Sequence, residues 1–127
     1  MAQPSDSLTA VARSMERHNV GAIVVVENGR PAGIVTDRDL ALQVVARGVS
    51  PQKAVRDIMT APVKTVEQSE GVFDTTRTMM DAKVRRLPVV GEDDRVVGIV
   101  TLDDLLGVLS QELSHLIAGI KPEMETK

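Results

Sequence analysis

Gly33-Ile34-Val35-Thr36-Asp37-Arg38-Asp39-Leu40 is repeated, with six of its eight residues identical, as Gly98-Ile99-Val100-Thr101-Leu102-Asp103-Asp104-Leu105. The two stretches are 65 residues apart, whereas upstream residues match at an offset of 64, as Val25 does with Val89. The second copy therefore contains one inserted residue, which we place in the turn at Gly91–Arg95. Because internal repetition fixes the architecture, we interpret the chain as two copies of a unit of about 60 residues.

Each unit is predicted to run helix, strand, turn, strand, helix. In the first unit, apolar residues at i, i+3, i+4 and i+7 predict an opening helix, capped by a short polar side chain. The apolar positions are Leu8, Val11, Ala12 and Met15, and the candidate caps are Ser5, Asp6 and Ser7. The remaining predicted elements are a strand at Ala22–Val26, a turn at Asn28-Gly29, a strand at Ala32–Thr36, a helix from Asp37 to about Gly48 and a short helical link from Ser50 to Ile58.

The second unit follows the same order. We predict a short strand at Val63–Val66, a helix capped by Ser69, and paired strands at Leu87–Val90 and Val96–Val100. The apolar face of that helix is predicted to contain Val72, Phe73, Thr76, Met79 and Met80. The last helix begins near Leu102, and its apolar stripe comprises Leu105, Leu106, Leu109, Leu113, Leu116, Ile117 and Ile120.

These elements predict a mixed α/β (α+β) fold. Two small units, residues 1–60 and 61–127, would stack through their sheets with pseudo-two-fold symmetry and share one core, because neither is large enough to bury its own apolar faces. Residues 49–60 would link them. Applying the offset of 64 to Val63–Val66 places the first strand of unit one at positions −1 to 2, so that strand is expected to be truncated or absent.

The composition excludes several function classes. The 127 residues have a net charge of −3 and a single aromatic residue, Phe73, which disfavours nucleic-acid binding. There is no cysteine, and the two histidines, His18 and His115, lie far apart, so we expect no thiol chemistry and no metal centre. No apolar stretch is long enough to span a membrane, and the N-terminus lacks the features of a signal peptide. We therefore expect a cytoplasmic protein, and the absence of catalytic motifs indicates that it is not an enzyme.

The doubled Gly-hydrophobic-hydrophobic-Thr-x-x-Asp motif, the strand Val84–Val90 and the link Asp57–Thr60 resemble a tandem pair of cystathionine-β-synthase (CBS) domains, called a Bateman module. The resemblance covers nearly the whole chain. It implies a regulatory module that senses an adenosyl ligand, such as AMP, ADP, ATP or S-adenosylmethionine, in clefts between the repeats. Mg²⁺ would enter only with the nucleotide phosphates.

The motif suits such a ligand for a physical reason. Thr36 and Thr101 each lie where a strand meets a helix N-terminus, whose unpaired N–H groups favour an anion. Three residues later, Asp39 and Asp104 can accept both hydroxyls of a ribose, which is the role that the resemblance implies. The alternative from the same spacing is a capping box, in which the carboxylate bonds to the N-cap N–H instead. The two roles can alternate, with the cap closed when the cleft is empty.

Basic residues distinguish the two clefts. By resemblance, Arg85 and Arg86 would reach phosphates, as would Arg38 from the other repeat, whereas repeat 1 has Gly21 and Ala22 at the positions of Arg85 and Arg86. We therefore predict the better nucleotide site at Thr101 and Asp104, and a weaker cleft at Thr36, Asp39, Gly21 and Ala22. The better site would be completed by Arg85, Arg86, Arg38 and the strand Val63, Lys64, Thr65 and Val66. The alternative for the two arginines is a solvated surface pair.

Two functions from different classes follow. The first is a ligand-responsive regulatory module acting on an unidentified effector protein. The second is a structural dimerisation module with vestigial clefts. In either case the stripe from Leu105 to Ile120 predicts a homodimer formed through helices, because contiguous apolar surface usually meets a partner. The alternative is that the extra turns fold back over the module's own sheet.

Overall fold

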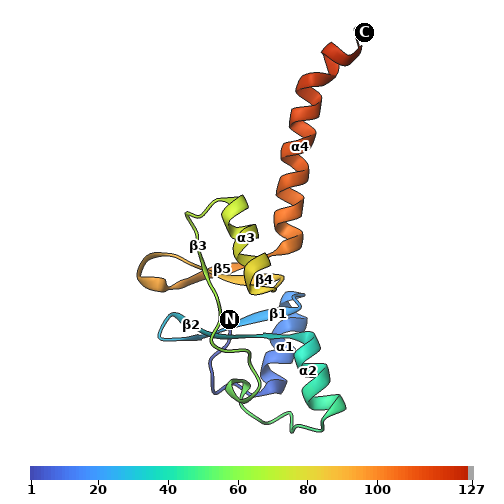
Figure 1. Ribbon diagram of the computed structural model, residues 1–127. Helices are drawn as coiled ribbons and strands as arrows, with labels where there is room; N and C mark the ends of the chain where they lie inside the picture. Colours follow the sequence, from blue (N-terminus) through green and yellow to red (C-terminus); the bar gives the residue numbers. More distant parts are fainter. Residues whose placement is uncertain (126–127) are drawn as a thin grey trace.

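The structure is a computed structural model that describes the backbone of residues 1–125 and the side chains of residues 1–111, 113 and 114. Repeat 1 comprises α1 (Leu8–His18), β1 (Ala22–Glu27), β2 (Arg30–Thr36), α2 (Asp37–Leu40), the π-helical η1 (Ala41–Ala46) and the 3₁₀ turn η2 (Val55–Asp57). Repeat 2 comprises β3 (Val66–Glu67), α3 (Val72–Ala82), β4 (Arg86–Val90), the 3₁₀ turn η3 (Glu92–Asp94), β5 (Val96–Thr101) and α4 (Leu102–Glu125). Figure 1 shows α1 and α2 in the lower half of the molecule and α3 and α4 in the upper half, with the strands between them.

The two sheets repeat one topology. β1 and β2 pair as an antiparallel hairpin, as do β4 and β5, and each pair has one register shift at the equivalent position. β3 adds to β4 in parallel through Val66 and Val89. At the positions equivalent by the 64-residue offset, Ala2 forms an isolated parallel bridge with Val25. The first strand of repeat 1 is thus represented by a single bridging residue.

Local sequence signals explain most of the elements. Ser7 caps α1 by accepting a hydrogen bond from the N–H of Ala10, which selects one of the three predicted caps. Asn28 and Gly29 have φ angles of 54° and 80°, which a tight hairpin turn requires at its two central residues. The predicted strand positions are confirmed to within a few residues at their ends, except in β3. There the strand holds only Val66 and Glu67, so Val63–Thr65 lie outside it.

The buried residues form two clusters rather than the single shared core that we predicted. One contains Leu8, Val11, Ile23 and Val35 of repeat 1, and the other contains Met79, Leu87 and Leu105 of repeat 2. The reason is that successive side chains of a strand alternate between faces, and each repeat has its own helices to cover one face. Val24 and Pro88, on the opposite faces of β1 and β4, are buried but belong to neither cluster.

Two local predictions are wrong, and a third, the helix from Asp37 to about Gly48, holds in its extent but not in its type. The N-cap of α3 is Gly71 and no side chain caps the helix, because the helix begins three residues after Ser69. The predicted helix from Asp37 to Gly48 changes at Ala41 to a π-helix, in which the N–H of Arg47 donates to the carbonyl of Leu42. The predicted link helix after Ser50 contains only the 3₁₀ turn Val55–Asp57.

The helices of repeat 2 also differ from expectation in what they bury. Met79 is buried on α3, whereas Phe73 and Met80, predicted on the same apolar face, are exposed. α4 extends away from the body of the molecule (Figure 1). Leu105 is buried, whereas Leu106 and Leu113 are exposed, and the side chains of His115, Leu116, Ile117 and Ile120 lie outside the described residues. None of the helices in the described part of the chain is both long and apolar enough to cross a membrane.

Candidate functional site

The two Thr-x-x-Asp junctions each form a complete capping box. At the first, the Thr36 N–H donates to Oδ2 of Asp39 at 2.9 Å and the Asp39 N–H donates to Oγ1 of Thr36 at 3.1 Å. At the second, the corresponding distances between Thr101 and Asp104 are 3.2 Å and 3.1 Å. Both carboxylates are thus bonded to their own backbone. Each bond uses Oδ2 only, and a carboxylate accepts further hydrogen bonds, so a ligand hydroxyl would either share the carboxylate with the cap or replace the capping bond.

The junctions differ in how accessible the carboxylate is. Asp39 is half-buried, whereas Asp104 is exposed, and the bond from the Thr101 N–H is the longer of the two. Because a longer, solvated hydrogen bond is weaker, the Asp104 carboxylate is the easier one to recruit for a ligand. Both Asp residues are held by the first turn of a helix, so their placement follows from the N-cap threonines.

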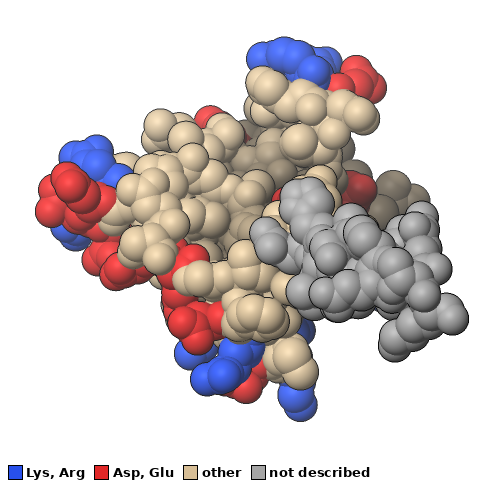
Figure 2. All heavy atoms as spheres, turned by 90° about the horizontal axis from the view of Figure 1, so that it is seen from above, with Lys and Arg blue, Asp and Glu red and all other residues tan. Residues whose placement is uncertain are grey.

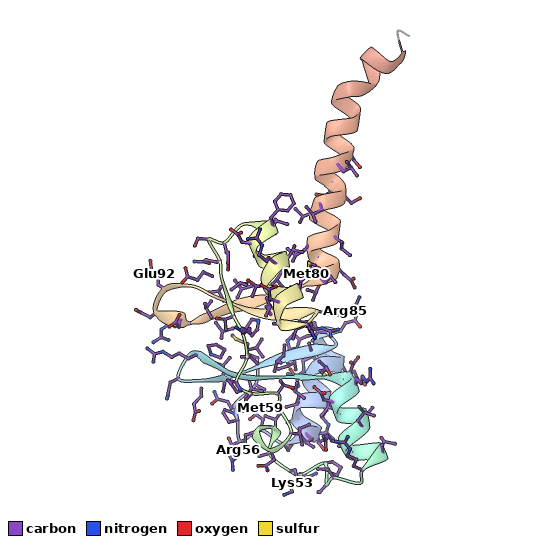
Figure 3. All side chains as sticks on the ribbon, in the orientation of Figure 1. Lys53, Arg56, Met59, Met80, Arg85 and Glu92 are labelled. Carbon is purple, nitrogen blue, oxygen red and sulfur yellow. The ribbon has the colours of Figure 1, made fainter. Side chains whose placement is uncertain are left out.

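The glycines that begin the two motifs also differ in their surroundings. A Cβ added at Gly33 would meet Sδ and Cγ of Met59, and the carbonyl oxygen of Thr60 at 2.9 Å. A Cβ added at Gly98 would meet nothing within 4 Å. The cause is the segment after repeat 1, in which Thr60 bridges to Ile34 at the edge of β2. Figure 3 shows Met59 below β2, in the lower half of the molecule.

A cavity of about 210 Å³ lies beside the open glycine and is bounded by both repeats. Repeat 2 contributes Gly98 and Ile99, and repeat 1 contributes Met1, Ser14, His18, Val20, Ala22, Ile23 and Val24. Its walls are mainly aliphatic. Since pockets that enclose a whole small molecule usually measure about 300–1,000 Å³, this cavity suits one ring of a ligand, with the remainder outside it.

His18 is one of the few polar groups of this cavity, and its ring contacts the preceding turn of α1. Its Nδ1 lies 2.9 Å from the carbonyl oxygen of Ser14, one helical turn earlier. A carbonyl only accepts hydrogen bonds, so Nδ1 carries the proton and Nε2 of the neutral ring is an acceptor. We assigned no role to His18 from the sequence. Its place at the end of α1, shortly before β1, is the sequence signal that could have located it near the cavity beside β1.

Three of the predicted site residues meet at one end of the sheet of repeat 2. Arg86 pairs with Thr101 across β4 and β5, and the carbonyl of Arg85 accepts from the N–H of Leu102 at 2.8 Å. The Arg85 guanidinium lies 4.0 Å from the Asp103 carboxylate, with side chains 74% and 86% exposed. Arg85 and Glu92 mark opposite ends of this sheet in Figure 3. This is the solvated arrangement expected of a weak surface ion pair.

Other predicted site residues are not brought to the same place. Val66 is buried in the repeat 2 cluster and lies across β4 from β5, so it can offer a ligand only backbone groups. Lys64 and Arg38 are exposed, and the backbone N–H of Arg38 donates to Oδ1 of Asp37 at 2.8 Å.

The cavity combines a residue of the weaker predicted cleft with the strand that leads to the better one. Gly21 accepts from the N–H of Asp37 through its carbonyl, just as Arg85 does from Leu102. Its neighbour Ala22, which we assigned to the weaker cleft, lines the cavity together with Gly98 and Ile99 of the strand that leads to Thr101. The sequence could not indicate this cavity wall, because β1 and β5 belong to different repeats and become neighbours only when the repeats stack.

The described residues contain no group of three or more His, Asp or Glu side chains placed to hold a metal ion.

Comparison with known proteins identifies the repeats. The model of the CBS domain family matches residues 1–46 and 55–111. An uncharacterised protein of Methanopyrus kandleri, MK0525, is 39% identical over 124 residues, which are 96% of this chain and 61% of that protein. The CBS domain-containing protein YhcV of Bacillus subtilis is 38% identical over 102 residues, covering 80% of this chain and 72% of YhcV. The chain therefore spans about three-fifths of the length of the first of these relatives and somewhat more of the second.

Solved structures show the same fold. The CBS domain pair of protein MJ0100, in complex with 5-methylthioadenosine and S-adenosyl-L-methionine, superposes with a TM-score of 0.76 at 29% identity, covering 87% of both chains. CBSX2 in complex with AMP gives a TM-score of 0.71 at 26% identity, again covering 87% of both. The cytosolic domain of the Mg²⁺ channel MgtE in complex with ATP gives 0.71 at 32% identity, covering 84% of this chain and 43% of that one.

Proposed function

The chain belongs to the CBS-domain family, and from that membership we propose that it is a non-catalytic regulatory module that binds an adenosyl ligand between its two repeats. Relatives of the same fold bind S-adenosyl-L-methionine with 5-methylthioadenosine, AMP and ATP. These ligands share an adenosine group and differ in what is attached to it. The proposed ligand is therefore an adenosine carrying phosphate, as in AMP, ADP or ATP, with S-adenosylmethionine as the alternative.

The observation that carries this proposal is the open cavity beside Gly98. It lies beside Gly98 and Ile99 in the middle of β5, the strand that ends at Thr101, so an aromatic ring held there is close enough along the strand for its attached groups to extend toward that junction. The aliphatic walls fit a purine, and Nε2 of His18 can accept a hydrogen bond from an exocyclic amine. At the corresponding glycine of repeat 1, Met59 and Thr60 occupy the space.

The sugar and phosphates are assigned to the junction at Asp104. To accept the two ribose hydroxyls, this carboxylate would give up its bond from the Thr101 N–H, which frees that donor and the helix N-terminus for a phosphate oxygen. Arg85 and Arg86, at the same end of the sheet, would neutralise phosphate charge, with Arg38 and the backbone of Val63–Val66 as further predicted contacts. The junction at Thr36 and Asp39, with Gly21 and Ala22, remains the weaker predicted cleft.

The test is a calorimetric titration of AMP and ATP, the latter with and without Mg²⁺, against the wild-type chain, Asp104→Ala and Asp39→Ala. We expect Asp104→Ala to lose at least about tenfold in affinity, because a charge-assisted hydrogen bond contributes roughly 1.5–3 kcal/mol. Asp39→Ala should bind like the wild type. If Asp39→Ala abolishes binding and Asp104→Ala does not, the assignment of the junctions is wrong.

A second variant tests the cavity itself. Gly98→Leu places a side chain where an added Cβ has free space, so the fold should be retained while the proposed ring site is filled. Gly107→Leu, at a glycine that is equally unobstructed but lies on α4, is the matched control. Affinity should fall in Gly98→Leu only. Equal affinity in both variants would place the ligand elsewhere.

A second candidate function, a structural interaction module with vestigial clefts, is favoured by the capping boxes that close both junctions. A thermal-shift panel of adenosyl compounds with an extrinsic dye separates the two. A ligand at 100 times its Kd stabilises the fold by about 2.7 kcal/mol, whereas a structural module would show no shift with any compound.

The proposed module also acts through partners. Exposed apolar side chains on α3 and α4 support a homodimer formed through helices, and the regulated effector would be a separate protein. Light scattering at micromolar concentration tests the dimer, and a monomeric mass would remove it.

A further inference from the structure

The outer edges of the two sheets differ in what pairs with them. In repeat 1 the edge of β2 is paired, because Ile34 exchanges two backbone hydrogen bonds of 3.1 and 2.9 Å with Thr60 of the returning chain. Ile99 of β5 is the residue equivalent to Ile34 by the 65-residue offset. Among the described residues, none outside the β4–β5 pair forms a backbone hydrogen bond with Ile99. The edge of β5 is therefore open at the point where the edge of β2 is closed.

The backbone N–H and carbonyl of Ile99 face away from β4. Ile99 lies opposite Pro88, which has no N–H to donate. In an antiparallel pair of strands, residues that bond directly across the pair alternate with residues whose backbone groups point outward. The equivalent pair of repeat 1, Val24 and Ile34, is of the outward kind, because both residues bond to backbone groups outside the hairpin. Ile99 thus presents one donor and one acceptor at a free edge.

The side chains of β5 do not discourage pairing. The strand Val96–Thr101 contains no charged residue and no proline, whereas β2 begins with Arg30 and Pro31. Charged residues and proline are two means by which proteins keep a free edge from pairing with another chain. Val97 of β5 is moreover 55% exposed although it is aliphatic. An open edge of this composition is a template for a further strand.

The covered edge of repeat 1 shows what such a strand would contact. Met59, next to Thr60, lies over Gly33, and its Sδ and Cγ fill the space that a Cβ would need there. At Gly98 a Cβ would meet nothing within 4 Å, and the cavity of about 210 Å³ borders this glycine. By the 64-residue offset the counterpart of Thr60 falls at position −4, so residues 1–127 contain no counterpart. The open edge therefore has room for a side chain of the size of methionine beside its free backbone groups.

We propose that the edge of β5 binds an extended segment of a partner protein by strand addition, with a methionine or another unbranched apolar side chain over Gly98. The segment copies the way in which the chain's own Met59 and Thr60 cover the edge of β2. Main-chain hydrogen bonds to Ile99 supply affinity, and the space at Gly98 supplies specificity. The molecule seen from above has uncharged surface in the middle and charged side chains toward the edges (Figure 2). Apolar contact and main-chain hydrogen bonds, rather than ion pairs, are therefore expected to hold the segment.

The partner segment and the proposed adenosyl ligand exclude each other. Both need the cavity beside Gly98, which the proposed function gives to the adenosine ring. This exclusion rests on the proposed function, whereas the docking of the segment does not. Binding of the ligand would release the partner, so the same cavity would both sense the ligand and transmit its presence.

A peptide taken from the chain itself tests the docking. The probe is a fluorescein-labelled peptide with the sequence of residues 55–63, and its binding to the full chain is followed by fluorescence anisotropy. The matched control is the same peptide methylated on the backbone nitrogen of Thr60, which removes the N–H that donates to Ile34 in the chain's own pairing. We expect the methylated peptide to bind at least about tenfold more weakly, because the carbonyl of Ile99 would be covered without a donor. Equal binding of the two peptides, or no binding up to about 1 mM peptide, refutes the docking.

A variant and an exchange measurement locate the peptide on β5. Ile99→Pro removes the free donor at an outward position of an edge strand, where proline is tolerated, and should abolish peptide binding. Amide hydrogen exchange of the wild-type chain needs no substitution: the N–H of Ile99 should exchange faster than that of Ile34, and should slow when the peptide is added. Binding that persists in Ile99→Pro, or an Ile99 N–H that the peptide does not protect, refutes this edge as the site. Protection that instead rises with protein concentration alone identifies a second copy as the occupant and refutes the partner segment.

AMP distinguishes the docking from the proposed function. Where AMP binds in calorimetry, it should displace the labelled peptide from the wild-type chain. AMP that binds and leaves the peptide in place refutes the exclusion. AMP that does not bind refutes the proposed function, and the exclusion with it, while peptide binding still decides the docking.

Discussion

The two repeats share a backbone but differ in what surrounds the same motif. In repeat 1 the glycine of the motif is covered by Met59 and Thr60, and the aspartate is half-buried. In repeat 2 the glycine borders a cavity and the aspartate is exposed. The capping boxes are nevertheless alike in both. Duplication has thus preserved the local geometry of the junctions while their accessibility has diverged.

The cause of the difference lies in the chain that follows each motif. After repeat 1, the chain returns along the edge of β2, where Thr60 and Ile34 exchange two backbone hydrogen bonds of 2.9 and 3.1 Å. After β5, the chain continues as the long helix α4 and leads away from the sheet. The same motif therefore has a covered edge in one repeat and an open edge in the other.

The largest expected effect comes from adding a methyl group to the two motif glycines. Gly33→Ala forces a Cβ against Met59 and the Thr60 carbonyl, and should destabilise the fold by about 1–3 kcal/mol, the usual cost of overpacking. Gly98→Ala meets nothing and should change stability by less than about 0.5 kcal/mol. Urea unfolding of both variants measures the difference. Equal destabilisation would show that the two edges are equally covered.

Removing the capping threonines should have a smaller effect. Thr36→Ala and Thr101→Ala each remove one side-chain cap, at a cost of about 1 kcal/mol. The cost should be greater at Thr36, whose cap is half-buried and so cannot be replaced easily by water. Thermal unfolding followed by circular dichroism compares the two, with Thr36→Ser and Thr101→Ser as controls that keep the hydroxyl. A larger loss at Thr101 would reverse this part of the comparison.

We expect the smallest effect on stability from removing the negative charge of Asp103, which distinguishes the second junction from the first. Asp103 occupies the position of Arg38 and pairs weakly with Arg85. Asp103→Asn should leave stability unchanged within about 0.5 kcal/mol, because exposed pairs contribute little. It releases Arg85, so affinity for ATP should rise by up to about fivefold at low salt, as expected for removal of an interaction of at most about 1 kcal/mol. Unchanged affinity in calorimetry would show that Arg85 is a surface residue without a role in binding.

Short-range features of this protein could be predicted well. The capping boxes involve residues three apart, and the turn at Asn28-Gly29 depends on two residues that tolerate positive φ. The prediction that Ser69 caps α3 also used only short-range features, and it was wrong because the helix begins later, at Val72. The prediction that Phe73 and Met80 belong to the buried face of α3 was wrong for another reason. Helical spacing shows that residues share a face, but not whether that face meets the core or a partner.

The candidate site was only partly predictable. Thr101, Arg85 and Arg86 meet because β4 and β5 are neighbours in one hairpin, which the spacing of the motif indicates. The cavity wall was missed because Ala22 and Gly98 are 76 residues apart and come together only when the repeats stack. The cytoplasmic location, the boundaries at residue 60 and the roles of the site residues stay predictions.

By itself the sequence determined that the protein is a duplicated unit with a capped strand-to-helix junction in each half, because those features depend on hydrogen bonds between residues close along the chain. Only the tertiary structure decided that the motif glycine of repeat 1 is covered, that the motif glycine of repeat 2 borders a cavity, and that Phe73 points away from the core. These outcomes depend on which surfaces remain after the sheets and helices have packed, and packing joins residues whose separation along the chain carries no signal.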